Sequence, residues 1–178
     1  SHFYVSADHD YVLAGSKVNI SASAVDTNYI PMDRDYDLDA SAGKLDGNVL
    51  TTPSRGGEVT ITAESGKKKG TTTVYAIAEP TDVAIRNSSG TIITTLSAAP
   101  GTTTALTGSA AYHHISLKAD PEAFDWEVTG GIGTIDQSGN FTATTPGSGT
   151  ITATAGGIAA AIFFGFLVAL IFKAKPKR

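Results

Sequence analysis

Residues 124–156 read FDWEVTGGIGTIDQSGNFTATTPGSGTITATAG, and this stretch decides the fold class. Phe124, Trp126 and Val128 alternate with two acidic residues, which is the period-2 pattern of a strand with one buried face. Turn signals follow at residues 130–131, 136–139 and 146–149. Short segments rich in threonine and apolar residues lie between these turns. Turns at this spacing are typical of an all-β sandwich.

The composition limits the kind of protein. The chain has 178 residues, which suits one or two small domains, each large enough for a core of its own. It contains no cysteine, so packing alone must hold the strands together. All 17 acidic residues lie before position 137, and residues 1–172 carry only 9 basic groups. This acidic body argues against nucleic-acid binding, which needs a basic surface.

The same order of strands and turns occurs twice, at an offset of about 90 residues. In the first copy Tyr36 and Leu38 match Phe124 and Trp126 of the second. Gly43, Leu45 and Asp46 match Gly133, Ile135 and Asp136. A period of this length predicts two sandwich domains in series. Their expected bounds are residues 1–78 and residues 79–157, and the second domain has an extra hairpin.

Seven residues are expected to form the structural framework of these domains. Trp126 is the expected core tryptophan of the second sandwich, because such folds commonly bury one. The full set is Trp126, Phe124, Tyr36, Leu38, Gly133, Ile135 and Phe141.

Four motifs of the second copy point to a known family. They are GTTTALTGSA at 101–110, FDWEV at 124–128, GTIDQSGNFTA at 133–143 and GSGTITAT at 147–154. Their order resembles bacterial immunoglobulin-like domains of group 2. The second copy also looks like modules appended to exported bacterial phosphodiester glycosidases. The resemblance implies tandem immunoglobulin-like sandwiches outside the cell. No glycosidase catalytic domain is present, so the resemblance implies no activity for this chain.

One acidic series is a weak candidate for a metal site. Its members alternate along the strand that bears Tyr36 and Leu38, and they are Asp33, Asp35, Asp37 and Asp39. The series fails as an EF-hand loop, because position six is Leu38 instead of glycine and position twelve is Lys44 instead of glutamate. With period 2 the four carboxylates line one solvated face. A loose cation site with Asp8 and Asp10 is the less favoured alternative, so we predict no metal.

Other side chains that suggest chemistry have plainer interpretations. His113 and His114 are adjacent, and the repeat places them in an exposed loop after the second strand. Asp125 and Glu127 flank Trp126 and resemble a glycosidase carboxylate pair, but the alternation places both on the solvent face. The chain has no nucleophile-elbow, phosphate-loop or HExxH motif. We therefore predict a chain without enzymatic activity and without a cofactor.

The C-terminal tail is strongly apolar. Residues 155–172 read AGGIAAAIFFGFLVALIF without a charge, and KAKPKR follows. Eighteen apolar residues are near the lower limit for a helix that crosses about 30 Å of hydrocarbon. We predict a transmembrane helix at 158–172 and a basic cytoplasmic tail at 173–178. The residues expected in this anchor are Ile158, Phe163, Phe164, Phe166, Leu167, Leu170, Phe172, Lys173 and Lys175.

The repeat offers a competing interpretation of the tail. The first domain ends with a predicted strand at 71–78, and its equivalent in the second domain is 158–164. If that segment is a strand, the residues after it are too few to span a bilayer. If it is a helix, the second domain exposes a sheet edge. The apolar character of both faces favours the helix.

These observations predict a non-catalytic module on the outside of a bacterial cell, with one membrane pass. The chain opens with SHFYV, inside a strand pattern, so we expect it to be part of a longer polypeptide. The favoured role is a spacer or adhesion module that displays an upstream domain and contacts a host surface protein. The alternative is an accessory region that positions cell-wall polysaccharide for an exported phosphodiester glycosidase.

Overall fold

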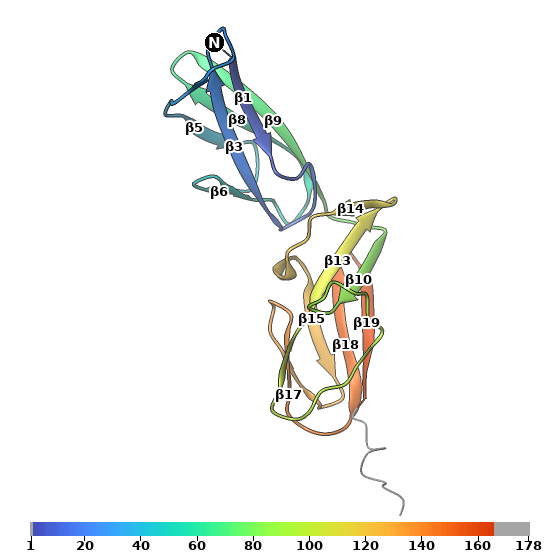
Figure 1. Cartoon of the computed structure of the whole chain (residues 1–178). Helices are drawn as coiled ribbons and strands as arrows, with labels where there is room; N and C mark the ends of the chain where they lie inside the picture. The colour runs from blue at the N-terminus through green and yellow to red at the C-terminus, as the bar shows by residue number, and fades with distance from the viewer. Residues whose placement is uncertain (1, 166–178) are drawn as a thin grey trace, which may run out of the picture. The chain divides into compact units, whose positions relative to one another are not determined.

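A computed structural model describes residues 2–165 of the chain. Within this range the protein is built from strands, apart from one turn of 3-10 helix, η1 (Pro121–Ala123). The all-β class predicted from the sequence is therefore confirmed. The chain divides into two compact units (Figure 1). Of the described residues, the first unit contains 2–82 and 109–123, and the second contains 83–108 and 124–165.

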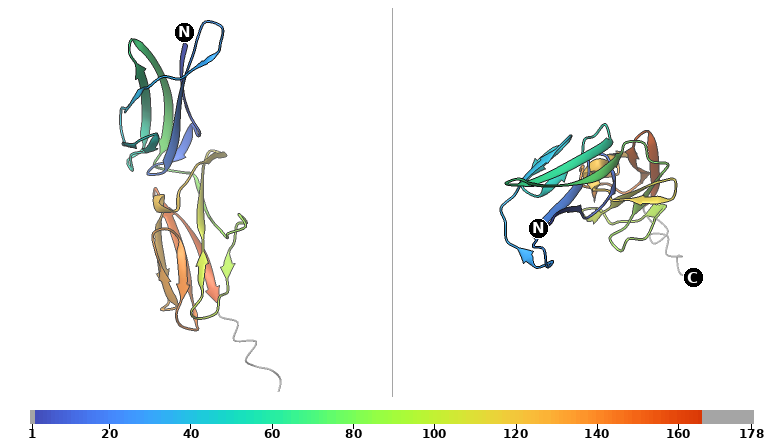
Figure 2. Two further views of the ribbon diagram at one scale, coloured as in Figure 1. Left: turned by 60° about the vertical axis from the view of Figure 1, so that its left-hand side comes forward. Right: turned by 90° about the horizontal axis from the view of Figure 1, so that it is seen from above.

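The first unit contains two sheets, which Figure 2 shows as separate layers. One sheet has the order β1 (His2–Ala7), β3 (Lys17–Val25), β7 (Val49–Thr51) and β6 (Lys44–Asp46), and β4 (Pro31–Met32) pairs with β3. The other has the order β2 (Tyr11–Leu13), β9 (Lys68–Ile77), β8 (Gly57–Ser65) and β5 (Asp37–Ala40). Lettered along the chain, these sheets have the immunoglobulin orders A-B-E-D and G-F-C, with β2 added in parallel beside β9.

The core between these two sheets is aliphatic. Strands β3, β7, β8 and β9 alternate between buried and exposed positions, as expected for strands with one face on a core. The buried side chains that pack together are Val12, Ala14, Val18, Ile20, Leu50, Val59, Ile61, Val74 and Ala76. No aromatic side chain belongs to this cluster in the described part of the chain.

The second unit repeats the strand order of the first. One sheet has the order β11 (Thr95–Leu96), β19 (Ile158–Gly165), β18 (Ser148–Ala155) and β15 (Asp125–Thr129). The facing order is β12 (Thr103–Ala105), β17 (Asn140–Ala143) and β16 (Gly133–Ile135). Strand β14 (Ile115–Leu117) and most of β13 (Thr107–Tyr112) belong to the first unit and pair with each other, whereas most of β10 (Asp82–Arg86) belongs to the second. The parallel pairing of β11 with β19 matches that of β2 with β9, which supports the internal repeat.

Aromatic side chains fill the core of the second unit. Phe124, Trp126, Phe141 and Phe164 are all 5% exposed or less. The rings of Phe141 and Phe164 meet edge to face, with 5.1 Å between their centroids. Glycine at position 108 makes room for Phe124, because a Cβ there would lie 2.5 Å from the ring. Of the other framework residues, Tyr36, Leu38, Gly133 and Ile135 are half-buried.

The predicted transmembrane helix at 158–172 is wrong for residues 158–165, which form strand β19. This strand pairs with β18 over eight residues and with β11 over two. Its alternate residues Ile162 and Phe164 are buried at 1% exposure, whereas Phe163 is 54% exposed. The helix interpretation failed because the outward positions of β19 are also apolar, so the strand alternation was invisible.

The competing strand interpretation is the correct one for this segment. A two-residue turn, Gly156-Gly157, joins β18 to β19, and both glycines have positive φ. Gly-Gly is a hairpin signal, which favours the strand interpretation of this segment. The other expected anchor residues, Phe166, Leu167, Leu170, Phe172, Lys173 and Lys175, and the basic tail at 173–178, lie outside the described residues. Residues 2–165 contain no helix of the length and apolarity needed to cross a membrane.

Candidate binding surface

The acidic series of the first unit does not form a cation site among the described residues. Asp37 and Asp39 lie on β5, Asp33 and Asp35 precede that strand, and all four side chains are exposed. Within residues 2–165 the structure brings no three histidine, aspartate or glutamate side chains into a metal-binding group.

The alternating carboxylates instead lie on strands at the edges of sheets. Strand β5 is the last strand of its sheet, and its outward residues are Asp37 and Asp39. Strand β15 has the same place in the second unit, and its outward residues are Asp125 and Glu127. An open edge invites pairing with another chain, and charged side chains oppose it. Both carboxylate pairs therefore have a structural explanation.

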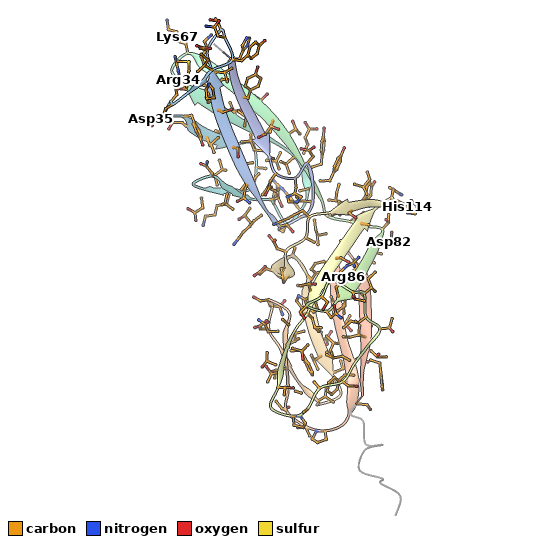
Figure 3. The ribbon with its side chains drawn as sticks, viewed as in Figure 1. Arg34, Asp35, Lys67, Asp82, Arg86 and His114 are labelled. Carbon is orange, nitrogen blue, oxygen red and sulfur yellow. The ribbon has the colours of Figure 1, made fainter. Side chains whose placement is uncertain are left out.

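The two adjacent histidines form a tight turn. His113 and His114 join β13 to β14, where Tyr112 pairs with Ile115. Figure 3 shows His114 at the outer end of this hairpin. Both histidines have positive φ, 45° and 71°, as a type I′ turn requires. The expectation of an exposed loop at this position agrees with the structure.

The most exposed aromatic group of the described chain lies at one end of the first unit. We call it the tyrosine tip, and it consists of His2, Tyr4, Tyr29 and Ile30. Tyr4, Tyr29 and Ile30 are 50%, 70% and 58% exposed. The His2 ring stacks on Tyr29 at 6.0 Å and lies 6.2 Å from Tyr4. Contiguous exposed apolar patches are typical of contact sites, so the tip is a candidate contact surface.

Strand geometry and a rigid turn hold the tip in place. His2 and Tyr4 are alternate residues of β1 and therefore lie on the same face. Tyr29 and Ile30 belong to the turn between β3 and β4, where the carboxylate of Asp26 accepts hydrogen bonds from the amides of Asn28 at 2.7 Å and Ile30 at 3.0 Å. The Asp26 amide donates to the carbonyl of Ile30 at 2.9 Å. This network holds Tyr29 at a φ of 62°.

The tip was missed in the sequence because its members are dispersed. Residues 2–4 and 29–30 belong to different strands, and only the pairing of β1 with β3 brings them together. One signal was available, because Asp-Thr-Asn at 26–28 favours a turn that would expose the two residues after it.

A second pair of exposed tyrosines lies on the outer face of the β2 and β9 strands. Tyr11 and Tyr75 are directly opposite each other in register. Their rings stack at 5.3 Å with an interplanar angle of 18°. They are 42% and 39% exposed, so part of each ring contacts solvent.

Comparisons with known proteins identify no family for the chain. No protein-family model matches it, and no curated protein matches it significantly. Solved structures give weak similarities. Domains 4 and 5 of the S-layer protein SbsC share 15% identity, with 93% of this chain and 98% of that chain covered and a TM-score of 0.38.

Two bacterial adhesins give similar values. A C-terminal 282-residue fragment of intimin, solved with the intimin-binding domain of the translocated intimin receptor, shares 15% identity at a TM-score of 0.37, and the alignment covers 90% of this chain and 62% of the fragment. The Yersinia pseudotuberculosis adhesin InvE shares 13% identity at a TM-score of 0.36, over 91% of this chain and 58% of InvE. These scores are too low to assign a function. The resemblance to glycosidase modules is not shown by these matches.

Proposed function

We propose that this chain is a non-catalytic adhesion module of a bacterial cell surface. In this proposal the first unit contacts a partner protein through the tyrosine tip, and the second unit is a spacer. The observation that carries it is the cluster of exposed aromatic rings at the tip. Tyr4 and Tyr29 are 50% and 70% exposed, and both lie beside the His2 ring. In the second unit Phe124, Trp126, Phe141 and Phe164 are buried, and Phe163 of β19 is 54% exposed. The cell-surface location rests on the resemblance of the sequence motifs to bacterial immunoglobulin-like domains.

The chemistry of the tip suits a protein partner. Tyrosine side chains are enriched at the centres of protein interfaces, because they bury a large ring and still offer a hydroxyl. Ile30 adds an aliphatic contact at 58% exposure. The turn is fixed by Asp26 through hydrogen bonds at 2.7 and 3.0 Å, so little conformational freedom is lost when a partner binds.

Binding to mammalian cells tests this proposal. We expect the fluorescently labelled chain to bind intact cells and to lose that binding after the cells are treated with protease. The variant Tyr29→Asn with Ile30→Thr should bind at least tenfold less, since asparagine tolerates the positive φ and threonine keeps the β-branched shape. The matched control Tyr11→Thr removes an exposed tyrosine outside the tip and should bind normally. Equal binding by the tip variant, or unchanged binding to protease-treated cells, would refute the proposal.

A second candidate function is the positioning of cell-wall polysaccharide for an exported phosphodiester glycosidase. The pair Tyr11 and Tyr75 favours it, because exposed phenol rings offer both apolar faces and hydroxyl groups to sugar rings. Retention of the chain on purified cell-wall glycan, abolished by Tyr11→Thr with Tyr75→Thr and unaffected by the tip variant, would support this function over adhesion.

A further inference from the structure

A polar cleft of about 660 Å³ lies on the outer face of the sheet that contains β3, β7 and β6. The register places Lys17, Thr51 and Lys44 in one row across these three strands. Asn19, Val49 and Asp46 form the next row. Alternate residues share a face, so both rows point the same way, and the residues between them, such as Val18 and Leu50, enter the core.

The first row concentrates positive charge around a hydroxyl group. Lys17 and Lys44 are each the Cα partner of Thr51, so they lie two strand spacings apart, roughly 10 Å between Cα atoms. Both lysine side chains are exposed, and within residues 2–165 neither makes an ion pair. Lys17, Thr51 and Lys44 all line the cleft, and their ammonium and hydroxyl groups are donors that suit an oxyanion.

The backbone of Lys17 forms hydrogen bonds with Lys118 and Asp120 of the same unit. The Lys17 amide donates to a carboxylate oxygen of Asp120 at 2.6 Å, and its carbonyl accepts from the Lys118 ammonium at 2.5 Å. The Asp120 amide donates to the buried hydroxyl of Ser16 at 3.0 Å. These contacts fix the start of β3, and with it the direction in which the Lys17 side chain leaves the sheet. The charge of Lys118 is balanced by Asp120 at 2.6 Å, so Lys17 and Lys44 are the cations left for a ligand.

The remaining cleft residues limit what the anion is attached to. Asp46 lies one row away from the lysines. Its carboxylate repels a dense polyanion but accepts hydrogen bonds from hydroxyl groups. A ligand with isolated anionic groups on a hydroxyl-rich chain fits this arrangement.

We propose that this cleft binds an oxyanion carried by an acidic polysaccharide, with Lys17, Thr51 and Lys44 around the anionic group and Asp46 on a neighbouring hydroxyl. This site is separate from the tyrosine tip and does not depend on the adhesion proposal. The shared chemistry of the ligand is a singly charged oxyanion, and it has two sources in such polymers, a carboxylate and a phosphodiester.

Calorimetric titration of the whole chain with three probes tests the proposal. Oligogalacturonate supplies carboxylates, oligo(glycerol phosphate) supplies phosphodiesters, and methyl-esterified oligogalacturonate is the neutral control. We expect one or both charged probes to bind and the ester to bind at least tenfold more weakly. The charged probe that binds more tightly identifies the source. The absence of heat from both charged probes at millimolar concentration would overturn the proposal, as would equal binding of the ester.

Variants separate a defined site from general attraction. Lys17→Gln with Lys44→Gln should weaken binding of the charged probe about tenfold, as expected for two exposed charge-assisted contacts. Thr51→Val keeps a β-branched residue in β7 and should lower the affinity for the charged probe about two- to fivefold. The matched control is Lys67→Gln with Lys68→Gln, which makes the same charge change at the β8–β9 turn. Figure 3 shows Lys67 at the same end of the unit as Arg34 and Asp35. If this control loses as much affinity as the cleft variant, the site does not exist.

Discussion

The two units share a strand order but fill their cores with different side chains. In the first unit Val, Ile, Leu and Ala side chains fill the core, and Tyr4, Tyr11, Tyr29 and Tyr75 are at least 39% exposed. In the second unit the aromatic side chains Phe124, Trp126, Phe141 and Phe164 are buried. The core of the first unit contains no tyrosine, and these four tyrosines lie on its surface. The difference teaches that sandwiches with the same strand order can fill their cores with different classes of side chain.

The two units also share a feature at their edges. Strands β5 and β15 end their sheets, and each presents two outward carboxylates. Outward carboxylates on edge strands are therefore common to both units, whereas the proposed recognition surface belongs to the first. This contrast makes the stability of each unit and the binding of the first unit separately testable.

Removal of β19 is the change with the largest expected effect. A chain that ends at residue 157 lacks the partner of β18 and loses the buried Ile162 and Phe164. We expect the second unit to lose cooperative unfolding, while the first unit, whose β8–β9 hairpin is intact, still melts. Calorimetry of chains that end at 157 and at 165 measures this difference. Two cooperative transitions in the shorter chain would show that β19 is dispensable.

Matched core truncations compare the two ways of filling a sandwich. Phe141→Ala removes a fully buried ring that contacts Phe164, and we expect a loss of about 3–5 kcal/mol in the unfolding free energy of the second unit. Leu50→Ala, on the corresponding strand β7, should cost the first unit about 2–4 kcal/mol. Urea denaturation followed by tryptophan fluorescence reports on the second unit through Trp126. A change in that signal caused by Leu50→Ala would mean that the units do not unfold independently.

The sequence was sufficient for the parts of the fold that depend on alternation and turn chemistry. Asp125, Trp126 and Glu127 alternate clearly between polar and apolar, and their strand was predicted. Strand β19 failed because Ala161 and Phe163 are apolar on its outer face, which made a strand resemble a membrane helix. The two turn glycines before it carried the correct information.

The candidate surfaces depend on register, which a single sequence does not reveal. The tyrosine tip requires β1 beside β3, and the cleft requires Lys17 and Lys44 opposite the same residue of β7. Each lysine alone reads as a solvated surface charge. Only the sheet order, in which β7 lies between β3 and β6, makes them neighbours across a threonine.

The two-residue turns at 156–157 and 113–114 allow a smaller comparison, in which substitutions should change stability in opposite directions. Gly157 has a φ of 78° and open space where a Cβ would lie, so Gly157→Ala tests backbone strain alone and should destabilise the second unit by about 1 kcal/mol. His114 has a φ of 71° without being glycine, so His114→Gly should stabilise the first unit by about 0.5–1 kcal/mol. Thermal denaturation of both variants measures the two shifts. Destabilisation by His114→Gly would indicate that the imidazole makes a contact that outweighs the strain.

The smallest expected effect is on stability at low pH, and it again compares the two units. In the second unit the Asp136 carboxylate accepts hydrogen bonds from the Asn140 amide at 2.9 Å, the Asn140 side chain at 3.0 Å and the Ser138 amide at 3.0 Å. These bonds lower the pKa of Asp136 below its ordinary value of 3.8. In the first unit burial opposes the shift, but hydrogen bonds from Asn19 lower the pKa of Asp8 in the same way.

Because each pKa is lower in the folded state, each carboxylate stabilises its unit above pH 3.8, and that stabilisation is lost as the pH falls through the folded value. Asp136→Asn keeps one acceptor oxygen without the charge. It should therefore flatten the decline in the melting temperature of the second unit between pH 5 and about pH 2, while Asp8→Asn should do so for the first. Calorimetric scans at several pH values distinguish the two transitions. If Asp136→Asn altered the acid response of the first unit instead, the two units would be coupled, and the proposed division into a recognition unit and a spacer would have to be abandoned.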